Sequence, residues 1–337
     1  MVSTAKIGVV VIGRNEGDRL IRSLDSVVNG SHTVVYVDSG STDGSCEAAR
    51  DRGVEVVNLD RSVPFTAARA RNAGFKRLQN LQPDIEYVQF IDGDCEVVPG
   101  WMEAATTVLD THPDVVAVCG WRRERYPERS VFNRICDVEW RICPVGENLA
   151  FGGDVLIRAK SLAAVGGYDP IVIAGEEHEL AVRLRQQGGK ILRIDQVNTL
   201  HDADMHHFSQ WWNRAKRCGY AYSLVASMHG ASPEHKFVRE VRRTWLWGFV
   251  MPLTALVLMP LTNGFSLLIL ARYPLTALKT TYNTHRQGIS WGDSIVWGLS
   301  CSISAFPEVT GAIKFQLNRL QNRQHEIIEY KGPRVEG

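Results

Sequence analysis

The sequence lacks both a paired set of cysteines and an excess of charge. Seven cysteines are scattered over 337 residues, and no two are spaced as C-x-x-C. An odd, scattered set argues against a disulfide framework and against a cysteine-type zinc site, so a reducing compartment is the simpler expectation. The 38 Lys and Arg nearly balance the 37 Asp and Glu. Without a clustered basic excess, no nucleic-acid partner is expected.

Two loop patterns are also missing after the first apolar run, at residues 7–12. The loop that follows, Gly13-Arg14-Asn15-Glu16, does not read G-x-G-x-x-G, so a dinucleotide oxidoreductase is excluded. A nucleotidyltransferase should show a Gly-rich basic loop at this place. This loop has little glycine and carries an acid, which argues against that class as well.

What is present is a regular alternation of short apolar runs and helical patterns over the first 120 residues. The runs are too short for helices and suit buried parallel strands. Their alternation with helices predicts an α/β fold with a Rossmann-like, mostly parallel sheet and helices on both faces. Such sheets bind ligands beyond the carboxyl ends of their strands. The expected strands are 7–12, 33–37, 54–58, 87–91 and 115–119, and the expected helices are 18–28, 45–52, 67–78 and 101–109.

The middle of the chain is less regular. Residues 122–153 follow no clear period, and Pro127 and Pro144 break the pattern. Further on, we expect helices at 157–165 and 176–187, each followed by a Gly-Gly pair, and a late strand at 191–194.

The last third of the chain forms an apolar helical region. Residues 245–271 contain no charged residue, and about 20 apolar residues are enough to span a bilayer. Pro252, Pro260 and an Asn-Gly pair interrupt this run, so a buried hairpin, a re-entrant segment, a kinked span and a soluble helical subdomain all stay open. Basic residues on both sides favour an interfacial or hairpin arrangement over one clean crossing. A weaker apolar run covers 291–307, and an amphipathic helix is expected at 312–330.

Asp38 ends the second expected strand and opens the segment Asp-Ser-Gly-Ser-Thr-Asp-Gly. A carboxylate at the carboxyl end of a strand can accept a hydrogen bond from a base N–H or a ribose hydroxyl. A Ser/Gly turn that leads into a capped helix is an equally open interpretation.

Asp92 and Asp94 directly follow the expected strand at 87–91, separated by Gly93, which lets the chain turn tightly. Two carboxylates at i and i+2 can place oxygens on one divalent ion, and Mg²⁺ and Mn²⁺ prefer such hard ligands. A cation there would neutralise the charge that builds on a diphosphate leaving group. An Asp-Gly turn without a metal is the alternative, and the position after a buried strand favours the metal.

Five further candidates lie downstream. Glu176 and Glu177 begin a predicted helix, where an acid either complements the helix dipole or, as a general base, deprotonates an attacking hydroxyl. His201 opens a segment dense in His and Asp, which suits a metal ligand, and zinc binding by that segment alone stays open. Arg214 and Arg217 can pair with phosphate, or belong to an amphipathic helix on the core or on a membrane surface.

Taken in order, these motifs resemble those of the family 2 glycosyltransferases, which have the GT-A fold. The resemblance runs from Lys6 to about Tyr222 and rests on several motifs in the same sequence order. The first loop, with Asn15 and Glu16, is similar to the loop where the family meets the nucleotide. Asp38 stands where the resemblance implies a contact with the base.

The resemblance also assigns residues on the donor side. Arg71 lies in Ala-Arg-Asn-Ala-Gly, which resembles the family's helix near the donor. Asp92-Gly93-Asp94 resembles the metal motif, which implies that Asp94 is the more direct ligand and that Asp92 aids ribose or metal. Asp154 follows a Gly-Gly pair on the acceptor side, where family members often have Asn.

The remaining assignments concern the base and the metal. Glu177 stands at the family's catalytic base position, where Asp is usual, with Glu176 as the alternative. His201 resembles a late histidine that some members add to the metal site. Arg214 and Arg217 lie in a stretch that resembles the interface helix of membrane-associated bacterial members.

The resemblance implies an inverting glycosyltransferase with Mn²⁺ or Mg²⁺ as cofactor. The donor would be a nucleotide-diphospho-sugar, which we expect to be a UDP-sugar, and the acceptor a saccharide or lipid-linked saccharide in polysaccharide or cell-surface glycan synthesis. The alternatives are a sugar nucleotidyltransferase and a non-catalytic, membrane-bound nucleotide-sugar-binding protein.

The same reading divides the chain into a GT-A catalytic domain at residues 1–222 and a helical, membrane-associated region at 223–337. We expect membrane contact through residues 211–307, on the cytoplasmic face of the inner (plasma) membrane.

Overall fold

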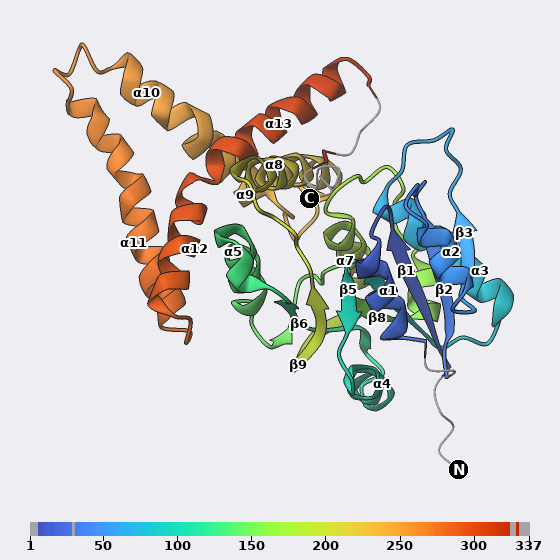
Figure 1. Ribbon diagram of the computed structural model, residues 1–337. Helices are drawn as coiled ribbons and strands as arrows, with labels where there is room; N and C mark the ends of the chain where they lie inside the picture. The colour runs from blue at the N-terminus through green and yellow to red at the C-terminus, as the bar shows by residue number, and fades with distance from the viewer. Residues whose placement is uncertain (1–5, 29–30, 324–327, 330–337) are drawn as a thin grey trace. The chain divides into compact units, whose positions relative to one another are not determined.

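The computed structural model describes residues 6–28, 31–323 and 328–329 (Figure 1). Contacts divide the chain into two compact units. The first contains Met1–Arg125 and Cys143–Ala203, and the second contains Tyr126–Ile142 and Asp204–Gly337. The sequence suggested one boundary at residue 222. The contacts place the division after Ala203 and add Tyr126–Ile142 to the second unit.

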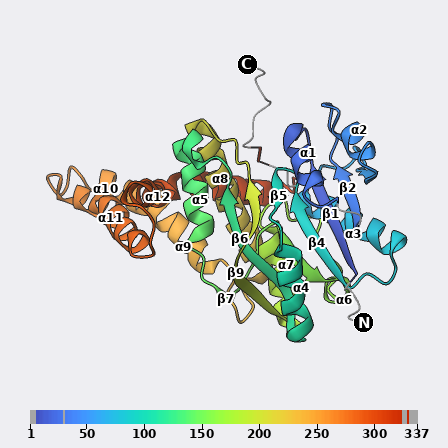
Figure 2. The same ribbon diagram turned by 60° about the horizontal axis from the view of Figure 1, so that its bottom comes forward.

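The first unit contains a nine-stranded sheet in the order β3-β2-β1-β4-β8-β6-β9-β5, with β7 paired to β9. Figure 2 shows β2, β1 and β4 side by side, with parallel pairing. The strands are β1 (Ile7–Gly13), β2 (Thr33–Asp38), β3 (Glu55–Asn58), β4 (Tyr87–Asp92), β5 (Cys95–Val97), β6 (Val115–Glu124), β7 (Gly146–Glu147), β8 (Val155–Arg158) and β9 (Lys190–His201).

The sheet is mixed, and its longest strand pairings are parallel. Strands β1 to β4 and the β6–β9 pair are parallel, whereas β8 runs antiparallel between β4 and β6, and β5 and β7 are antiparallel to β9. The helix expected at 157–165 is in fact β8 followed by α6 (Ala159–Ala164). A short apolar run does not distinguish a buried strand from a helix, and here pairing with β4 and β6 decides.

Helices cover both faces of this sheet, as expected. Val9 and Val11 of β1 pack with α1 (Asp18–Asp25), α2 (Ser45–Arg50) and α4 (Trp101–Thr111). Val10 and Ile12 face the other way, toward α3 (Ala67–Leu81), α6 and α7 (Glu176–Gln186). Both sides of β1 are therefore buried, which explains its nearly continuous apolar sequence.

The second unit is helical in its described part. The segment 122–153, which shows no regular period, contains the end of β6, the turn η1, the three-turn helix α5 and the short strand β7. The helix expected at 312–330 begins earlier and ends at Leu320, and residues 324–327 and 330 lie outside the described part. The elements are η1 (Pro127–Arg129), α5 (Val131–Arg141), α8 (Phe208–His229), α9 (Val238–Trp245), η2 (Leu246–Val250), α10 (Met251–Val257), η3 (Phe265–Ala271), α11 (Arg272–His285), α12 (Trp291–Ile303) and α13 (Ala305–Leu320).

The uncharged run 245–271 folds as a helical hairpin. The π-helical turn η2 joins α9 to α10, a turn with left-handed Asn263 (φ 49°) and Gly264 (φ 86°) follows, and η3 leads directly into α11 (Figure 1). Among the residues that the structure describes, no helix combines the length and the apolar character needed to cross a membrane.

Candidate active site

Two loops at the carboxyl ends of β1 and β2 are tied together. The backbone N–H of Asn15 donates to Ser41 Oγ (2.9 Å), and Asn15 Oδ1 accepts from the N–H of Thr42 (2.7 Å). The N–H of Gly17 donates to Asp43 Oδ2 (2.9 Å). Asn15 adopts a left-handed backbone (φ 55°), which Asn tolerates better than most residues. Asn15 therefore braces the loop that we expected to meet the nucleotide.

Asp38 organises the second of these loops. One of its oxygens accepts from the N–H groups of Gly40 (2.8 Å) and Ser41 (2.9 Å), and the other from the Tyr36 hydroxyl (3.0 Å). Burial alone would raise the pKa of Asp38, but the hydrogen bonds from Ser41 and Gly40 hold it below its ordinary value. Asp38 is thus an ionised, buried carboxylate, and its contact with a nucleoside stays a prediction.

Gly93 and Glu16 meet at the turn that follows β4. The N–H of Gly93 donates to the Ile12 carbonyl (2.7 Å). A Cβ on Gly93 would lie 3.0 Å from that carbonyl oxygen and 3.3 Å from Glu16 Cγ. Glu16 itself pairs with Arg19 (2.8 Å). The turn between the two aspartates therefore requires glycine because the chains approach closely.

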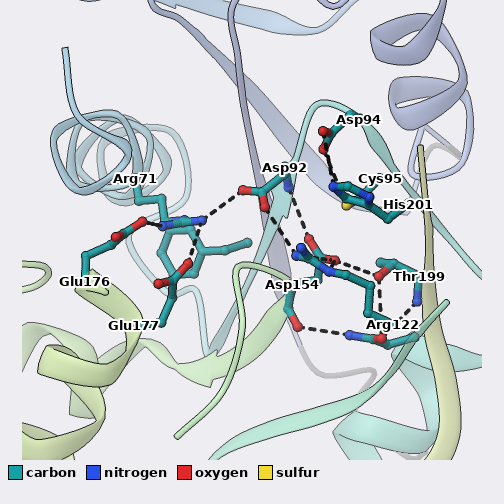
Figure 3. A network of polar contacts seen from close by, with 12 residues as sticks. Arg71, Asp92, Asp94, Cys95, Arg122, Asp154, Glu176, Glu177, Thr199 and His201 are labelled. Atoms are coloured by element: carbon teal, nitrogen blue, oxygen red, sulfur yellow. Dashed lines mark hydrogen bonds and ion pairs between the residues drawn. The ribbon is translucent and has the colours of Figure 1, made fainter. Parts of the chain in front are cut away.

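Asp92 lies between two arginines (Figure 3). Its Oδ1 accepts from Arg71 (2.8 Å) and its Oδ2 from Arg122 (3.2 Å). Gly153 also approaches closely, since a Cβ there would lie 2.5 Å from Asp92 Oδ2. Two guanidinium groups already balance the charge of this carboxylate, which makes it a less favourable place for a divalent cation.

Asp94 and His201 lie side by side on the other side of the site (Figure 3). His201 Nε2 is 3.3 Å from Asp94 Oδ2, and both side chains are buried. His201 Nδ1 lies 3.6 Å from Glu124 Oε2, so a carboxylate stands behind the imidazole. This arrangement of carboxylate, imidazole and second carboxylate is typical of metal sites in proteins. The donor set fits a divalent cation, which Asp94 and His201 would hold.

Cys95 is the third group near Asp94. Its Sγ lies 3.6 Å from Asp94 Oδ1 and the side chain is 1% exposed. Burial raises the pKa of Cys95 well above its ordinary value, so the thiol is neutral and packs in the core beside the site.

Asp154 connects Asp92 to Arg122. Its Oδ1 accepts from the backbone N–H of Asp92 (3.2 Å), and its Oδ2 accepts from Arg122 Nε (2.8 Å) and Thr199 Oγ1 (2.6 Å). The side chain is buried. Within the described residues, Asp154 therefore fixes the strand end that carries Asp92, and a contact with the donor stays a prediction.

Glu176 and Glu177 face Arg71 from the first turn of α7. Arg71 donates to Glu176 Oε1 (2.8 Å) and lies 3.4 Å from Glu177 Oε1. The Glu176 side chain is 3% exposed, whereas that of Glu177 is 18% exposed. Burial, followed by the charge of Glu176, raises the pKa of Glu177 to about 7. Of the two side chains, that of Glu177 is the more accessible to solvent.

Arg71 joins the two halves of the site. It is 1% exposed and its guanidinium lies 5.3 Å from the centre of the Tyr168 ring. Its polar contacts go to Asp92 on one side and to the two glutamates on the other (Figure 3). Within this structure, Arg71 therefore positions carboxylates, and its predicted contact with the donor stays untested.

Arg214 and Arg217 belong to α8 in the second unit, not to the unit that holds the other candidates. Arg214 donates to Glu139 (2.7 Å) of the same unit. Their contact with a donor stays a prediction. The sequence did not single out Arg122, Glu124 or Thr199, which lie where β6 and β9 reach the site.

The sequence comparison matches part of the chain to a known family. Residues 8–164 match the family model described as glycosyl transferase family 2. The glycosyltransferase AglE of Haloferax volcanii is 21% identical over 255 residues, which cover 72% of this chain and 71% of AglE.

Two solved structures share the fold. The mannosyltransferase PcManGT from Pyrobaculum calidifontis, in complex with GDP-Man and Mn²⁺, has a TM-score of 0.64 at 17% identity and covers 94% of this chain and 89% of its own. TarS of S. aureus, as a fragment, has a TM-score of 0.51 at 14% identity over 90% of this chain and 92% of its own. Together, these findings identify the protein as a glycosyltransferase that shares the fold of these two structures, and residues 8–164 match the family 2 model.

Proposed function

We propose that this glycosyltransferase uses a nucleoside-diphosphate sugar with Mn²⁺ or Mg²⁺ and transfers the sugar with inversion at the anomeric carbon. The proposal rests on one observation: a pair of side chains suited to a metal and a carboxylate suited to a general base lie on opposite sides of Arg71. A metal-type pair, Asp94 and His201, lies on one side, and an accessible carboxylate of raised pKa, Glu177, lies on the other.

On the donor side, Asp94 and His201 would hold the cation, with Glu124 orienting the imidazole. When bound, the cation supplies positive charge for the leaving diphosphate. Asp92, fixed by Arg71 and Arg122, is left to accept a hydrogen bond from the donor, such as one from a ribose hydroxyl.

On the acceptor side, Glu177 would act as the general base. Its carboxylate takes the proton of an acceptor hydroxyl while that oxygen attacks the anomeric carbon and the bond from this carbon to the diphosphate oxygen breaks. A single displacement of this kind inverts the anomeric centre. A pKa near the working pH suits this task, because the ionised form is populated and still basic.

The inverting mechanism is tested by the configuration of the product. The first product formed from an α-linked nucleotide sugar should be a β-glycoside by proton NMR. A first product that keeps the α configuration would contradict the proposal.

For the nucleotide, our sequence-based expectation is uridine, while the structure of the neighbour PcManGT is a complex with GDP-Man. A thermal-shift screen of UDP- and GDP-sugars in Mn²⁺ separates the two, because a ligand that binds the folded state raises the melting temperature. A shift with UDP-sugars alone supports the uridine proposal. A shift with GDP-sugars alone would replace it.

For the acceptor, we propose a saccharide or lipid-linked saccharide in polysaccharide or cell-surface glycan synthesis, at the cytoplasmic face of the plasma membrane. The support is the apolar character of the second unit, which includes residues 211–307. Transfer of radiolabelled sugar to a lipid extract, followed by solvent partition, would test it. Label that stays wholly water-soluble would count against a lipid-linked acceptor.

A further inference from the structure

The hairpin of residues 246–271 exposes many large apolar side chains in one place. The exposed fractions of these side chains range from 36% to 79%. In the first unit, exposed residues of this kind are few and mostly isolated, as at Val63 and Leu81. A contiguous apolar surface on a folded protein marks an interaction site. The exposed hairpin residues include Leu253, Leu256, Val257, Met259, Leu261, Phe265 and Leu268.

Several polar groups at the tip of this hairpin are hydrogen-bonded within the hairpin. The N–H and hydroxyl of Thr262 both donate to the Leu258 carbonyl (3.0 and 2.8 Å). The Thr262 hydroxyl oxygen accepts from the N–H of Ser266 (3.1 Å), and the Ser266 hydroxyl donates to the Ala255 carbonyl on the opposite arm (2.6 Å). A turn that keeps its hydrogen bonds within itself can enter an apolar medium at much lower cost.

The charged residues that flank the hairpin most closely in sequence are basic. Residues 241–292 contain no Asp or Glu. Arg242 and Arg272, one on each side of the apolar arms, are exposed. Anionic lipid headgroups attract such cations. A second copy of the hairpin would bring the same cations together, so the charges favour a lipid surface over self-association. The basic residues of this stretch are Arg242, Arg243, Arg272, Lys279 and Arg286.

The length of the arms sets the depth that they can reach. On the way in, η2 (5 residues) and α10 (7 residues) rise by about 18 Å at about 1.5 Å per residue. On the way back, η3 (7 residues) rises by about 14 Å at about 2 Å per residue before Arg272 begins α11. The hydrocarbon core is about 30 Å thick, so the uncharged arms match about half of it.

We propose that the hairpin 246–271 inserts into one leaflet of an anionic bilayer and anchors the enzyme without crossing. Leu261 and Phe265 enter the acyl region, and Arg242 and Arg272 lie at the headgroups. This inference deepens the proposed membrane association and specifies its segment, its depth and its lipid.

Vesicle flotation of the full chain tests the anchor. Wild type should float with vesicles of phosphatidylglycerol and phosphatidylcholine, and at least tenfold less with phosphatidylcholine alone. The double variant L261D/F265D should lose at least tenfold of its flotation. The matched control L149D/I171D changes two exposed apolar residues of the first unit and should float as wild type does.

Three results would overturn the anchor. The first is that the wild-type protein stays in the dense fraction, and the second is that the L261D/F265D variant floats as well as wild type. The third is a sedimentation measurement showing that the hairpin instead holds two copies of the chain together. Mn²⁺-dependent hydrolysis of the donor is measured on the same samples. Because hydrolysis needs no membrane, its retention in L261D/F265D separates failure of the anchor from failure of the proposed chemistry.

The depth is tested with chymotrypsin trapped inside the vesicles. A hairpin confined to the outer leaflet does not expose Leu261 or Phe265 to the lumen, so the chain should stay intact. Chymotrypsin added to the unbound protein in solution provides the positive control for cleavage in residues 258–268. Cleavage there by the trapped enzyme would show a crossing segment and overturn the one-leaflet arrangement.

Discussion

The pKa of Glu177 connects the geometry of the site to the pH dependence of the enzyme. Burial and the charge of Glu176 raise it to about 7, against the opposing effect of Arg71. A general base must be ionised, so kcat/KM should rise through pH 7 and level off above it, falling about tenfold per unit at lower pH. Steady-state rates from pH 5 to 9 measure this. A flat profile would contradict the role of Glu177.

Replacing the same residue also has a predicted effect on stability. The folded pKa lies above the ordinary value of 4.5, so the folded state loses stability as pH rises from 4.5 through about 7. Glu177→Gln removes that loss. The variant should match wild type in Tm near pH 4 and have a higher Tm at pH 8. The corresponding gain in the free energy of unfolding is at most about 3 kcal/mol. Turnover should fall by about 10²–10⁴ while donor binding is retained.

The two aspartates after β4 should differ in their effect on the metal. Asp94 faces His201 at 3.3 Å, whereas Asp92 lies between Arg71 and Arg122. Asp94→Asn should weaken Mn²⁺ binding in the presence of nucleoside diphosphate by at least tenfold, measured by electron paramagnetic resonance. Asp92→Asn should change it less. Equal losses in both variants would mean that the arginines do not keep the cation away from Asp92.

Neighbouring glycines offer a matched pair at the acceptor side. A Cβ on Gly153 would lie 2.5 Å from Asp92 Oδ2 and 2.7 Å from Arg71 Nη2, while a Cβ on Gly152 meets nothing within 4 Å. Gly153→Ala should therefore displace Asp92 and lower kcat/KM at least tenfold, since small shifts at a reacting centre are costly. Gly152→Ala should stay within twofold of wild type. Similar activity of the two variants would contradict this account.

The sequence singled out several of the acids that the structure groups around Arg71 and His201, but not the residues that hold them. Asp92 and Asp94 follow an apolar strand, and the glutamates begin a clear helix, so the ends of local elements pointed to the site. Arg122, Glu124 and Thr199 were not singled out because β6 and β9 continue past their apolar parts. The polar end of a strand lacks the apolar pattern that predicts a strand. Only the pairing of β6 and β9 with their neighbours shows how far these strands extend.

At the scale of elements, α8 and α13 pack with their backbones in contact. A Cβ on Gly311 would lie 1.9 Å from the Lys216 carbonyl oxygen, and one on Gly219 would lie 1.9 Å from the Glu308 carbonyl oxygen. Backbone cannot move aside as a side chain can. Gly311→Ala should therefore destabilise the protein by about 1–3 kcal/mol despite the better helix propensity of Ala.

The control for this prediction is Gly292→Ala near the start of α12. Its Cβ would meet one flexible atom, Arg134 Nη2 at 3.2 Å. Ala is the better helix former, so Gly292→Ala should be neutral or slightly stabilising. Differential scanning calorimetry of both variants measures the difference. A Gly311→Ala variant as stable as wild type would mean that the two helices do not pack this closely.

Elements with a clear local period were predicted well, and the others depended on distant partners. The strands at 33–37 and 87–91 and the helices at 67–78 and 101–109 lie within the observed elements. β5 has three residues and exists because it pairs with β9, and β8 owes its antiparallel place to β4 and β6. The order and direction of strands in a sheet depend on residues that are far apart in the sequence. The local pattern therefore did not predict which strands run antiparallel.

At the scale of the whole molecule, a near-zero net charge conceals an uneven distribution. The chain has a formal charge of +1, yet residues 241–292 contain only basic charges. Charges on exposed residues lose their effect as salt rises, because the Debye length falls to about 8 Å at 0.15 M. Membrane attraction from these residues should thus add to the apolar contribution of the hairpin at low salt and fade at high salt.

This division of the molecule predicts two different responses to the same variant. In the proposed mechanism the carboxylates of the first unit act on the donor and on the acceptor hydroxyl, whereas the hairpin belongs to the second unit. Anchoring raises the effective concentration of enzyme at a membrane-bound acceptor without any new contact at the site.

L261D/F265D should therefore lose at least tenfold in the rate of transfer to a lipid-linked acceptor in anionic vesicles, and 0.5 M salt should lower the wild-type rate in the same assay. With a short soluble acceptor, both proteins should have equal kcat/KM. Equal losses on the two acceptors would show that the variant damages the site itself, and the anchor would then not be what limits transfer.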